Sequence, residues 1–215
     1  MKEHMAVLST VALIYLGGNA TVPETITFES AAATNYGPAG ASFVDAGFRF
    51  TDVTGWMYVL MPEGCTPRCA YNETQRLLAY EDAQPMFEMT AESGGTFSLY
   101  GFDGGESFST MPDKWATHIV VEGRRPTGKA MTEVFDLDGI NDGMGPLTDY
   151  QSFTLHRKFT NVSSVRFYGL GGVDVSEFTI DNVIVKPSPP DRDSAPLILS
   201  DTGVVGLQTW WKRHG

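Results

Sequence analysis

Between residues 21 and 186 the chain is built from short runs of β-prone residues separated by glycine-rich turns. Within runs such as residues 47–50, apolar and polar side chains alternate, which is typical of a strand with one buried face. Turn signals such as those at residues 93–95 and 103–105 separate the runs. The predicted strands lie at residues 26–29, 47–50, 56–61, 77–80, 86–90, 96–102, 116–122, 130–137, 151–155, 165–168 and 177–185. This spacing predicts an all-β fold, an antiparallel sandwich of roughly ten strands.

The N-terminus has the pattern of a secretory signal peptide. A short start containing Lys2 precedes an apolar stretch at residues 5–16, and the small residues Gly18 and Ala20 fit cleavage after position 20. The alternative is an uncleaved membrane anchor, but a span needs about 20 apolar residues. We therefore expect a signal peptide at residues 1–20, a secreted β-sandwich domain at residues 21–186, and no stable membrane span in the mature chain.

The C-terminal part divides into a linker and a tail. Residues 187–196 are rich in proline, which removes backbone donors and restricts φ, so a linker is expected there. Residues 197–215 form an apolar stretch with a basic end that resembles the sorting tails of exported bacterial proteins. A frayed tail, or one strand packed on the body, is the favoured alternative.

The only two cysteines, Cys65 and Cys69, are four positions apart. In an exported protein the expectation is a disulfide that pins a small loop. Free thiols are the alternative, and a zinc site would need two further ligands that the surrounding sequence does not offer.

The formal net charge of -11 and the pI near 4.7 argue against a nucleic-acid partner. Such a chain repels phosphate backbones, and no stripe of Lys and Arg offsets that repulsion. Neutral sugars, cations or basic partners suit an acidic surface better, although many secreted proteins are acidic simply to remain soluble, which is the favoured explanation of this charge.

Three segments carry a resemblance to a known group of proteins. The opening Ile26-Thr27-Phe28-Glu29, the run Gly47-Phe48-Arg49-Phe50 and the closing residues 178–185 resemble a family of exported bacterial jelly-roll domains. Members often carry C-terminal sorting tails and are similar to carbohydrate-binding modules. The resemblance implies a jelly-roll sandwich whose first and last strands are neighbours, and a glycan or another cell-surface component as the partner.

The same resemblance implies a structural calcium ion between Glu29 and Asp181. Two carboxylates with backbone carbonyls form the oxygen shell that calcium prefers. The alternative is that Asp181 and Asn182 satisfy backbone groups of a turn. A second acidic segment, residues 136–143, fails the EF-hand spacing at Ile140, and a solvated hairpin turn is expected there.

Aromatic side chains near turns are candidates for stacking on sugar rings. The ligand-binding candidates are Trp115, Trp56, Tyr58 and Tyr100, and Trp115 is the first choice because charged residues flank it. Core packing is the alternative for each.

Catalytic motifs are missing from the sequence. No nucleophile elbow, zinc-binding His pair or phosphate-cradling glycine loop occurs, and neither His118 nor His156 has a recognisable partner. We therefore expect a secreted, non-catalytic module that binds carbohydrate or a cell-surface glycan. A structural protein of the cell surface or matrix is the alternative, followed by a small glycan-active enzyme.

Overall fold

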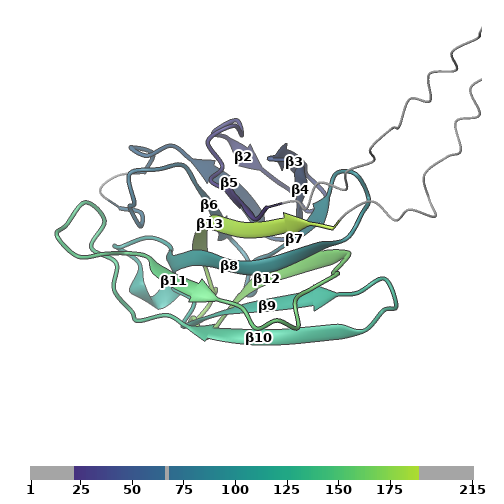
Figure 1. Cartoon of the computed structure of the whole chain (residues 1–215). Coiled ribbons are helices and arrows are strands. Elements are labelled where there is room, and N and C mark those ends of the chain that lie inside the picture. Colours follow the sequence, from purple (N-terminus) through teal and green to yellow (C-terminus); the bar gives the residue numbers. More distant parts are fainter. Residues whose placement is uncertain (1–21, 66–67, 189–215) are drawn as a thin grey trace, which may run out of the picture.

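The computed structural model describes residues 22–65 and 68–188 (Figure 1). The expected signal peptide, most of the proline-rich linker and the C-terminal tail lie outside these residues. The expected linker begins at Pro187, which is the last residue of the final strand and pairs with Phe97.

Two antiparallel sheets face each other and form a sandwich (Figure 1). The seven-stranded sheet has the order β11-β8-β13-β6-β5-β2, with β1 added beside β13. Its strands are β1 (Glu24–Ile26), β2 (Asn35–Tyr36), β5 (Trp56–Leu60), β6 (Arg76–Tyr80), β8 (Phe97–Glu106), β11 (Gln151–Thr154) and β13 (Phe178–Pro187). The six-stranded sheet has the order β10-β9-β12-β7-β4-β3. Its strands are β3 (Ser42–Asp45), β4 (Phe48–Thr54), β7 (Met86–Ala91), β9 (His118–Arg124), β10 (Ala130–Asp136) and β12 (Ser164–Leu170).

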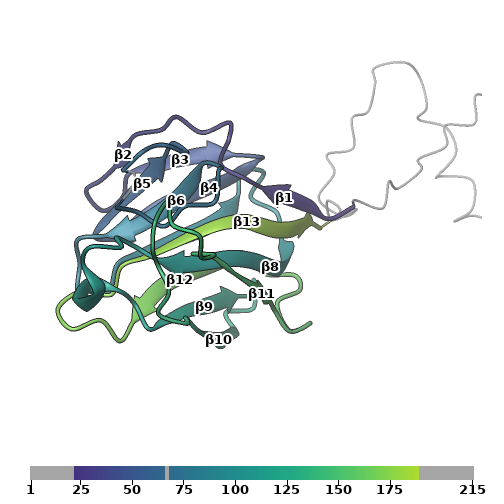
Figure 2. The same ribbon diagram turned by 90° about the vertical axis from the view of Figure 1, so that its left-hand side faces the viewer.

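The first and last strands are neighbours, as the sequence predicted. Strand β1 pairs antiparallel with β13, with Ile26 opposite Val183, and Figure 2 shows the two strands side by side. The predicted sandwich is confirmed, and residues 22–65 and 68–188 contain 13 strands in place of roughly ten. The additional elements are short, such as β2 and the separate β3, which local alternation alone marks weakly.

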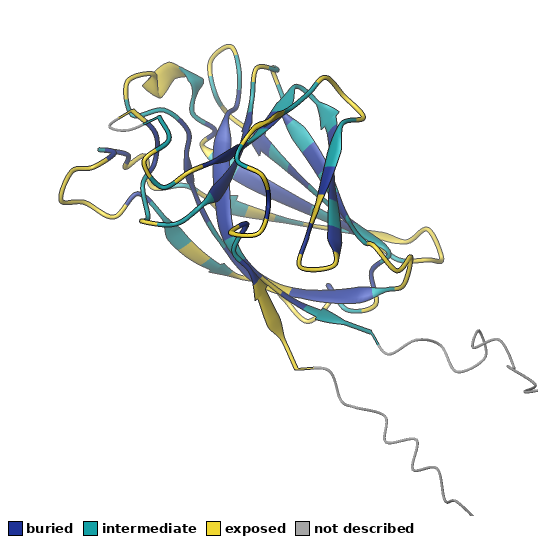
Figure 3. Cartoon of the chain, turned by 90° about the horizontal axis from the view of Figure 1, so that it is seen from above, coloured by how far each residue is buried: buried dark blue, intermediate teal, exposed yellow. Residues whose placement is uncertain are grey.

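The core lies between the sheets and is dominated by phenylalanine. In β4 the side chains of Phe48 and Phe50 are buried while Arg49 and Thr51 are partly exposed, as expected for a strand covered on one face. The rings pack within and between the sheets. Phe167 stacks on Phe87 of the neighbouring strand at a centroid distance of 5.1 Å, and it meets Phe102 of the other sheet edge-on. Figure 3 shows the buried residues on the strands and the exposed residues mainly on the loops. The alternating pattern therefore decides which face of each strand enters the core.

The predicted strand at residues 26–29 is wrong in its second half. Strand β1 ends at Ile26, and Phe28 has a left-handed backbone with φ 60°. This turn directs the fully buried Phe28 ring against Phe43 and Phe50, at centroid distances of 6.3 and 5.2 Å. Burial of a whole aromatic ring outweighs the cost of the unfavourable backbone conformation.

The expected hairpin at residues 136–143 is also wrong. Strand β10 ends at Asp136 in the six-stranded sheet, whereas the next strand, β11, belongs to the other sheet. The segment between them crosses from one sheet to the other, and its Asn141 is nearly buried, with an amide that donates to the Ser107 carbonyl at 2.9 Å. Because the Asn141 side chain is buried against the other sheet, residues 136–143 form a packed crossover and not a solvated hairpin turn. In the described part of the chain, no helix is long and apolar enough to span a bilayer.

Candidate functional site

A pocket of about 230 Å³ opens at one end of the sandwich, where three loops meet. The loops follow β8, β10 and β12, and the first contains the short 3-10 helix η1 (Pro112–Lys114). The side chains that give the pocket its chemistry are those of Glu106, Asp113, Trp115 and Thr117. Aromatic, carboxyl and hydroxyl groups therefore share one concave site.

Hydrogen bonds on both sides hold Trp115 in place. Its indole Nε1 donates to the carbonyl of Phe108 at 2.7 Å. The next residue, Ala116, donates its backbone N–H to Glu177, and Glu177 donates to Lys114, each at 2.9 Å. This short parallel bridge fixes the segment, so the half-buried ring is presented in one orientation.

The loop after β12 closes the pocket because two glycines allow a close approach. Gly171 has φ 88°, and a Cβ at this position would overlap the Thr117 hydroxyl. A Cβ at Gly172 would overlap the carbonyl of Val175 in the same loop and would lie 2.9 Å from the Trp115 carbonyl of the loop after β8. Side chains at either position would push this loop away from the others.

Glu106 is the buried acid of the pocket, with 1% of its surface exposed. Its Oε1 accepts a hydrogen bond of 2.7 Å from the backbone N–H of Gly139. Burial raises the pKa of the carboxyl group to about 7, and the nearby charges of Asp138 and Asp149 act in the same direction. Near neutral pH the group is therefore present in both forms, one that accepts and one that also donates a hydrogen bond.

Glu106 and Thr117 were not predicted from the sequence. The one signal for Glu106 is its place after Gly104-Gly105 at the end of a strand run, and such a glycine pair is common at turns. No feature of the sequence around Thr117 marked it as part of a site. Trp115, the first choice among the aromatic candidates, does line the pocket.

The other three aromatic candidates lie elsewhere. Tyr58 lines a separate apolar pocket on the seven-stranded sheet. Trp56 is on the same strand and packs so closely over Gly37 that a Cβ there would overlap its ring. Tyr100 is on β8 with 39% of its surface exposed. The four aromatic residues therefore do not form a single binding face.

Both internal histidines have partners, contrary to the sequence prediction. His118 Nε2 lies 3.3 Å from an Asp136 carboxylate oxygen, and its Nδ1 lies 2.7 Å from the Thr117 hydroxyl at the edge of the pocket. Asp136 comes from the neighbouring strand, and strand pairing brings residues 18 positions apart into contact in a way that local sequence does not reveal.

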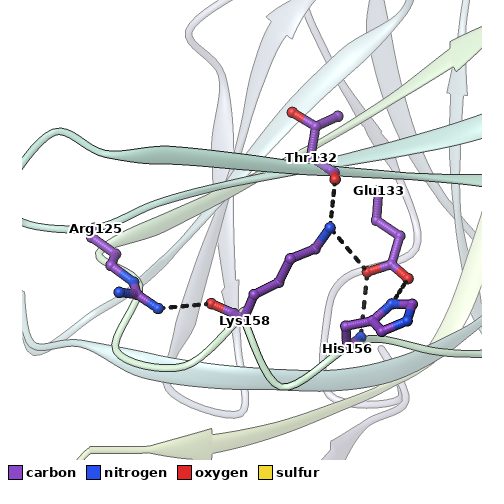
Figure 4. Close-up of polar contacts among 5 residues, drawn as sticks. All are labelled: Arg125, Thr132, Glu133, His156 and Lys158. Atoms are coloured by element: carbon purple, nitrogen blue, oxygen red, sulfur yellow. Dashed lines mark hydrogen bonds and ion pairs between the residues drawn. The ribbon is translucent and has the colours of Figure 1, made fainter.

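Figure 4 shows the second histidine where the segment after β11 crosses the edge strand β10. His156 contacts the carboxylate of Glu133 through its ring and its backbone N–H. Lys158 donates to the carbonyl of Thr132 at 2.8 Å and lies 3.9 Å from the same carboxylate, while Arg125 donates to the Lys158 carbonyl at 3.1 Å. With 78% of the His156 side chain exposed, the cluster fastens a surface segment to the edge of the sheet.

Glu29 and Asp181, the predicted calcium ligands, both bind the segment at residues 72–75. Asp181 is fully buried and accepts bonds of 2.7 Å from Asn72 and 2.6 Å from Thr74, besides one from its own neighbour's backbone. Glu29 is exposed and accepts from the backbone N–H of Gln75 at 2.7 Å. These donors satisfy Asp181 without a cation. Among the residues described, no cluster of three or more metal-binding side chains is found. Calcium binding stays a prediction.

The predicted disulfide between Cys65 and Cys69 is confirmed, with the two Cα atoms 5.5 Å apart. It closes the loop between β5 and β6, on the outer face of the seven-stranded sheet.

Comparison with known proteins gave structural similarities only. No family model and no curated protein matches the sequence. Among solved structures, a DUF4465 family protein from Bacteroides caccae is 12% identical, with a TM-score of 0.47, over 78% of this chain and 100% of the other. A family 29 carbohydrate-binding module from Piromyces equi is 8% identical, with a TM-score of 0.43, over 82% and 95%. The K2 cleaved adhesin domain of Lys-gingipain is 15% identical, with a TM-score of 0.45, over 76% and 97%. A likeness at this level does not identify a ligand for this chain.

Proposed function

We propose that this protein is a secreted carbohydrate-binding module and that the pocket at the end of the sandwich holds one sugar unit. The observation that carries the proposal is the combination of the Trp115 ring with the carboxyl groups of Glu106 and Asp113 in one pocket of about 230 Å³.

A sugar ring matches this combination because it has an apolar C–H face and a rim of hydroxyl groups. The C–H face packs on an aromatic ring, which contributes through buried apolar area. The hydroxyl groups donate to carboxylates, and bonds to charged acceptors are stronger than bonds between neutral groups. Thr117 adds a hydroxyl that both donates and accepts.

The charge of the pocket indicates a neutral sugar. Both ionisable side chains that line it are acids, and Asp138 and Asp149 add negative charge close to Glu106. A uronate or a sulfated sugar would meet repulsion there without a cationic partner. The overall charge of -11 acts in the same direction at longer range.

The test is a screen of neutral polysaccharides and oligosaccharides, followed by calorimetry with the best ligand. Trp115→Ala should lower its affinity at least about tenfold, which is about 1.4 kcal/mol. Trp115→Phe keeps a ring and should retain most of the binding, although it loses the bond to the Phe108 carbonyl. Tyr100→Ala is the matched control, since it removes an exposed aromatic side chain outside the pocket. No binding to any neutral glycan by the folded protein, or equal losses in Trp115→Ala and Tyr100→Ala, would overturn the proposal.

A small glycan-active enzyme is the second candidate, and the raised pKa of Glu106 favours it. A carboxyl group with a pKa of about 7 suits a general acid at neutral pH. Reducing-end assays on the bound glycan separate the two functions: an enzyme releases new reducing ends, and Glu106→Gln stops that release. A binding module leaves the glycan intact.

A further inference from the structure

A second pocket, of about 350 Å³, lies on the outer face of the seven-stranded sheet beneath the disulfide loop. Its floor is formed by β5 and β6, through Tyr58 and Leu60 of the first strand and Leu78 and Tyr80 of the second. Phe108 and the loop at residues 61–65 form further parts of the wall. The strand residues that line it point away from the sandwich core, and none of its lining residues also lines the proposed sugar site at the end of the fold.

A buried arginine holds the loop above this floor. Arg76 has no exposed surface, and its guanidinium group donates to the carbonyls of Met61 and Gly64 at 3.1 Å and of Pro62 at 3.3 Å. The disulfide joins the same loop to Cys69, which is fully buried. The pocket is therefore built by fixed groups, as expected for a preformed small-molecule site.

The lining of the pocket contains no charged side chain, and its polar side-chain atoms are the hydroxyls of Tyr58 and Tyr80 together with the disulfide sulfur of Cys65. Burial raises the pKa of Tyr80, and the nearby carboxylates of Glu81 and Glu177 raise it further. A side-chain hydrogen bond from Asn35 lowers it, because the Tyr80 oxygen accepts that bond. The Tyr80 hydroxyl thus keeps its proton and is able to donate a hydrogen bond.

These groups select a particular kind of ligand. Aromatic rings and polarisable sulfur atoms of Met61 and Cys65 favour an aromatic ring. A charged ligand would lose its hydration without finding a partner in the lining, and an anion would also face Glu81 and Glu177. The volume is at the small end of the range for ligand pockets.

We propose that this pocket binds a neutral aromatic molecule of one or two rings, whose carbonyl or ether oxygen accepts a hydrogen bond from Tyr80. The site goes beyond the proposed sugar binding, shares no lining residue with that pocket and takes a ligand of a different class.

The test is ligand-observed NMR with the full chain and three probes. Acetophenone carries a ring and an acceptor, benzoate has the same ring with a negative charge, and indole has a donor but no acceptor. Acetophenone should show saturation transfer and a dissociation constant in the millimolar range or tighter. Benzoate and indole should each bind about tenfold more weakly or not at all.

Two variants locate the binding. Ala33→Phe fills the pocket from its rim and should abolish acetophenone binding, while Tyr80→Phe removes the donor and should weaken it about tenfold. Tyr100→Phe removes a hydroxyl on β8 and is the matched control. If Ala33→Phe does not fold, Tyr80→Phe still decides the question. Unchanged binding in a folded Ala33→Phe or Tyr80→Phe variant, or equal binding of benzoate and acetophenone, would overturn the proposal.

Discussion

Lowering the pH from about 8 to about 5 should stabilise the folded protein, because buried carboxyl groups have raised pKa values. Burial raises the pKa of Glu106 to about 7 and that of Asp181 to about 6, from ordinary values of 4.5 and 3.8. Glu106 is 1% exposed and Asp181 is fully buried, so solvent screens neither group effectively. At pH 8 the fold therefore holds these two charges, together with that of the buried Asp52, which the unfolded chain would leave in water.

The sign follows from proton counting. A folded state whose carboxyl pKa is raised binds more protons than the unfolded chain between the two pKa values, so the free energy of unfolding falls as pH rises through this window. The cost is complete above the folded-state pKa values, at about pH 8, and is gone below the unfolded values, near pH 4. Each pKa unit corresponds to about 1.4 kcal/mol, so each carboxyl group contributes up to about 3 kcal/mol.

Urea denaturation at pH values between about 5 and 8 measures the effect as a change in the free energy of unfolding. Glu106→Gln removes one of the titrating groups and should make the dependence shallower without abolishing it, because Asp181 and Asp52, whose pKa burial also raises to about 6, still titrate. Asp113→Asn, at an exposed carboxylate near the same pocket, is the control and should leave the slope unchanged. A stability that is constant, or that rises with pH, would refute the account of these buried acids.

Three further outcomes follow from the core, the disulfide and the calcium prediction. Phe167→Ala removes a ring that packs on two other buried rings and should lower the free energy of unfolding by about 3–5 kcal/mol in chemical denaturation. Replacing Cys65 and Cys69 by alanine should cost about 2 kcal/mol, because the cross-link closes a very short loop, and a loss beyond about 5 kcal/mol would contradict this reading. If Glu29 and Asp181 share a calcium ion, millimolar calcium should raise the melting temperature and Asp181→Asn should remove the increase. No calcium effect in the unmodified protein would end that hypothesis.

The positions of the strands could be predicted from the sequence because the alternation of apolar and polar residues within a strand shows which of its faces is buried. Alternation in runs such as residues 47–50 reports which side chains enter the core, whatever the partner strand is. The disulfide could be predicted for a similar reason, since two cysteines four residues apart have no other partner in the chain. The pairing of the first and last strands was implied by the resemblance to known jelly-roll domains.

The candidate sites, by contrast, depend on which segments meet, and that is decided by the order of the strands in each sheet. Thr117, Gly139 and Gly171 come from three separate loops, and only the tertiary structure brings them together around Trp115. The left-handed turn at Phe28 likewise exists because its ring finds a place among other rings of the core. Local periodicity carries no information on these contacts, so the sequence determined the layers of the fold and the tertiary structure determined where a ligand can bind.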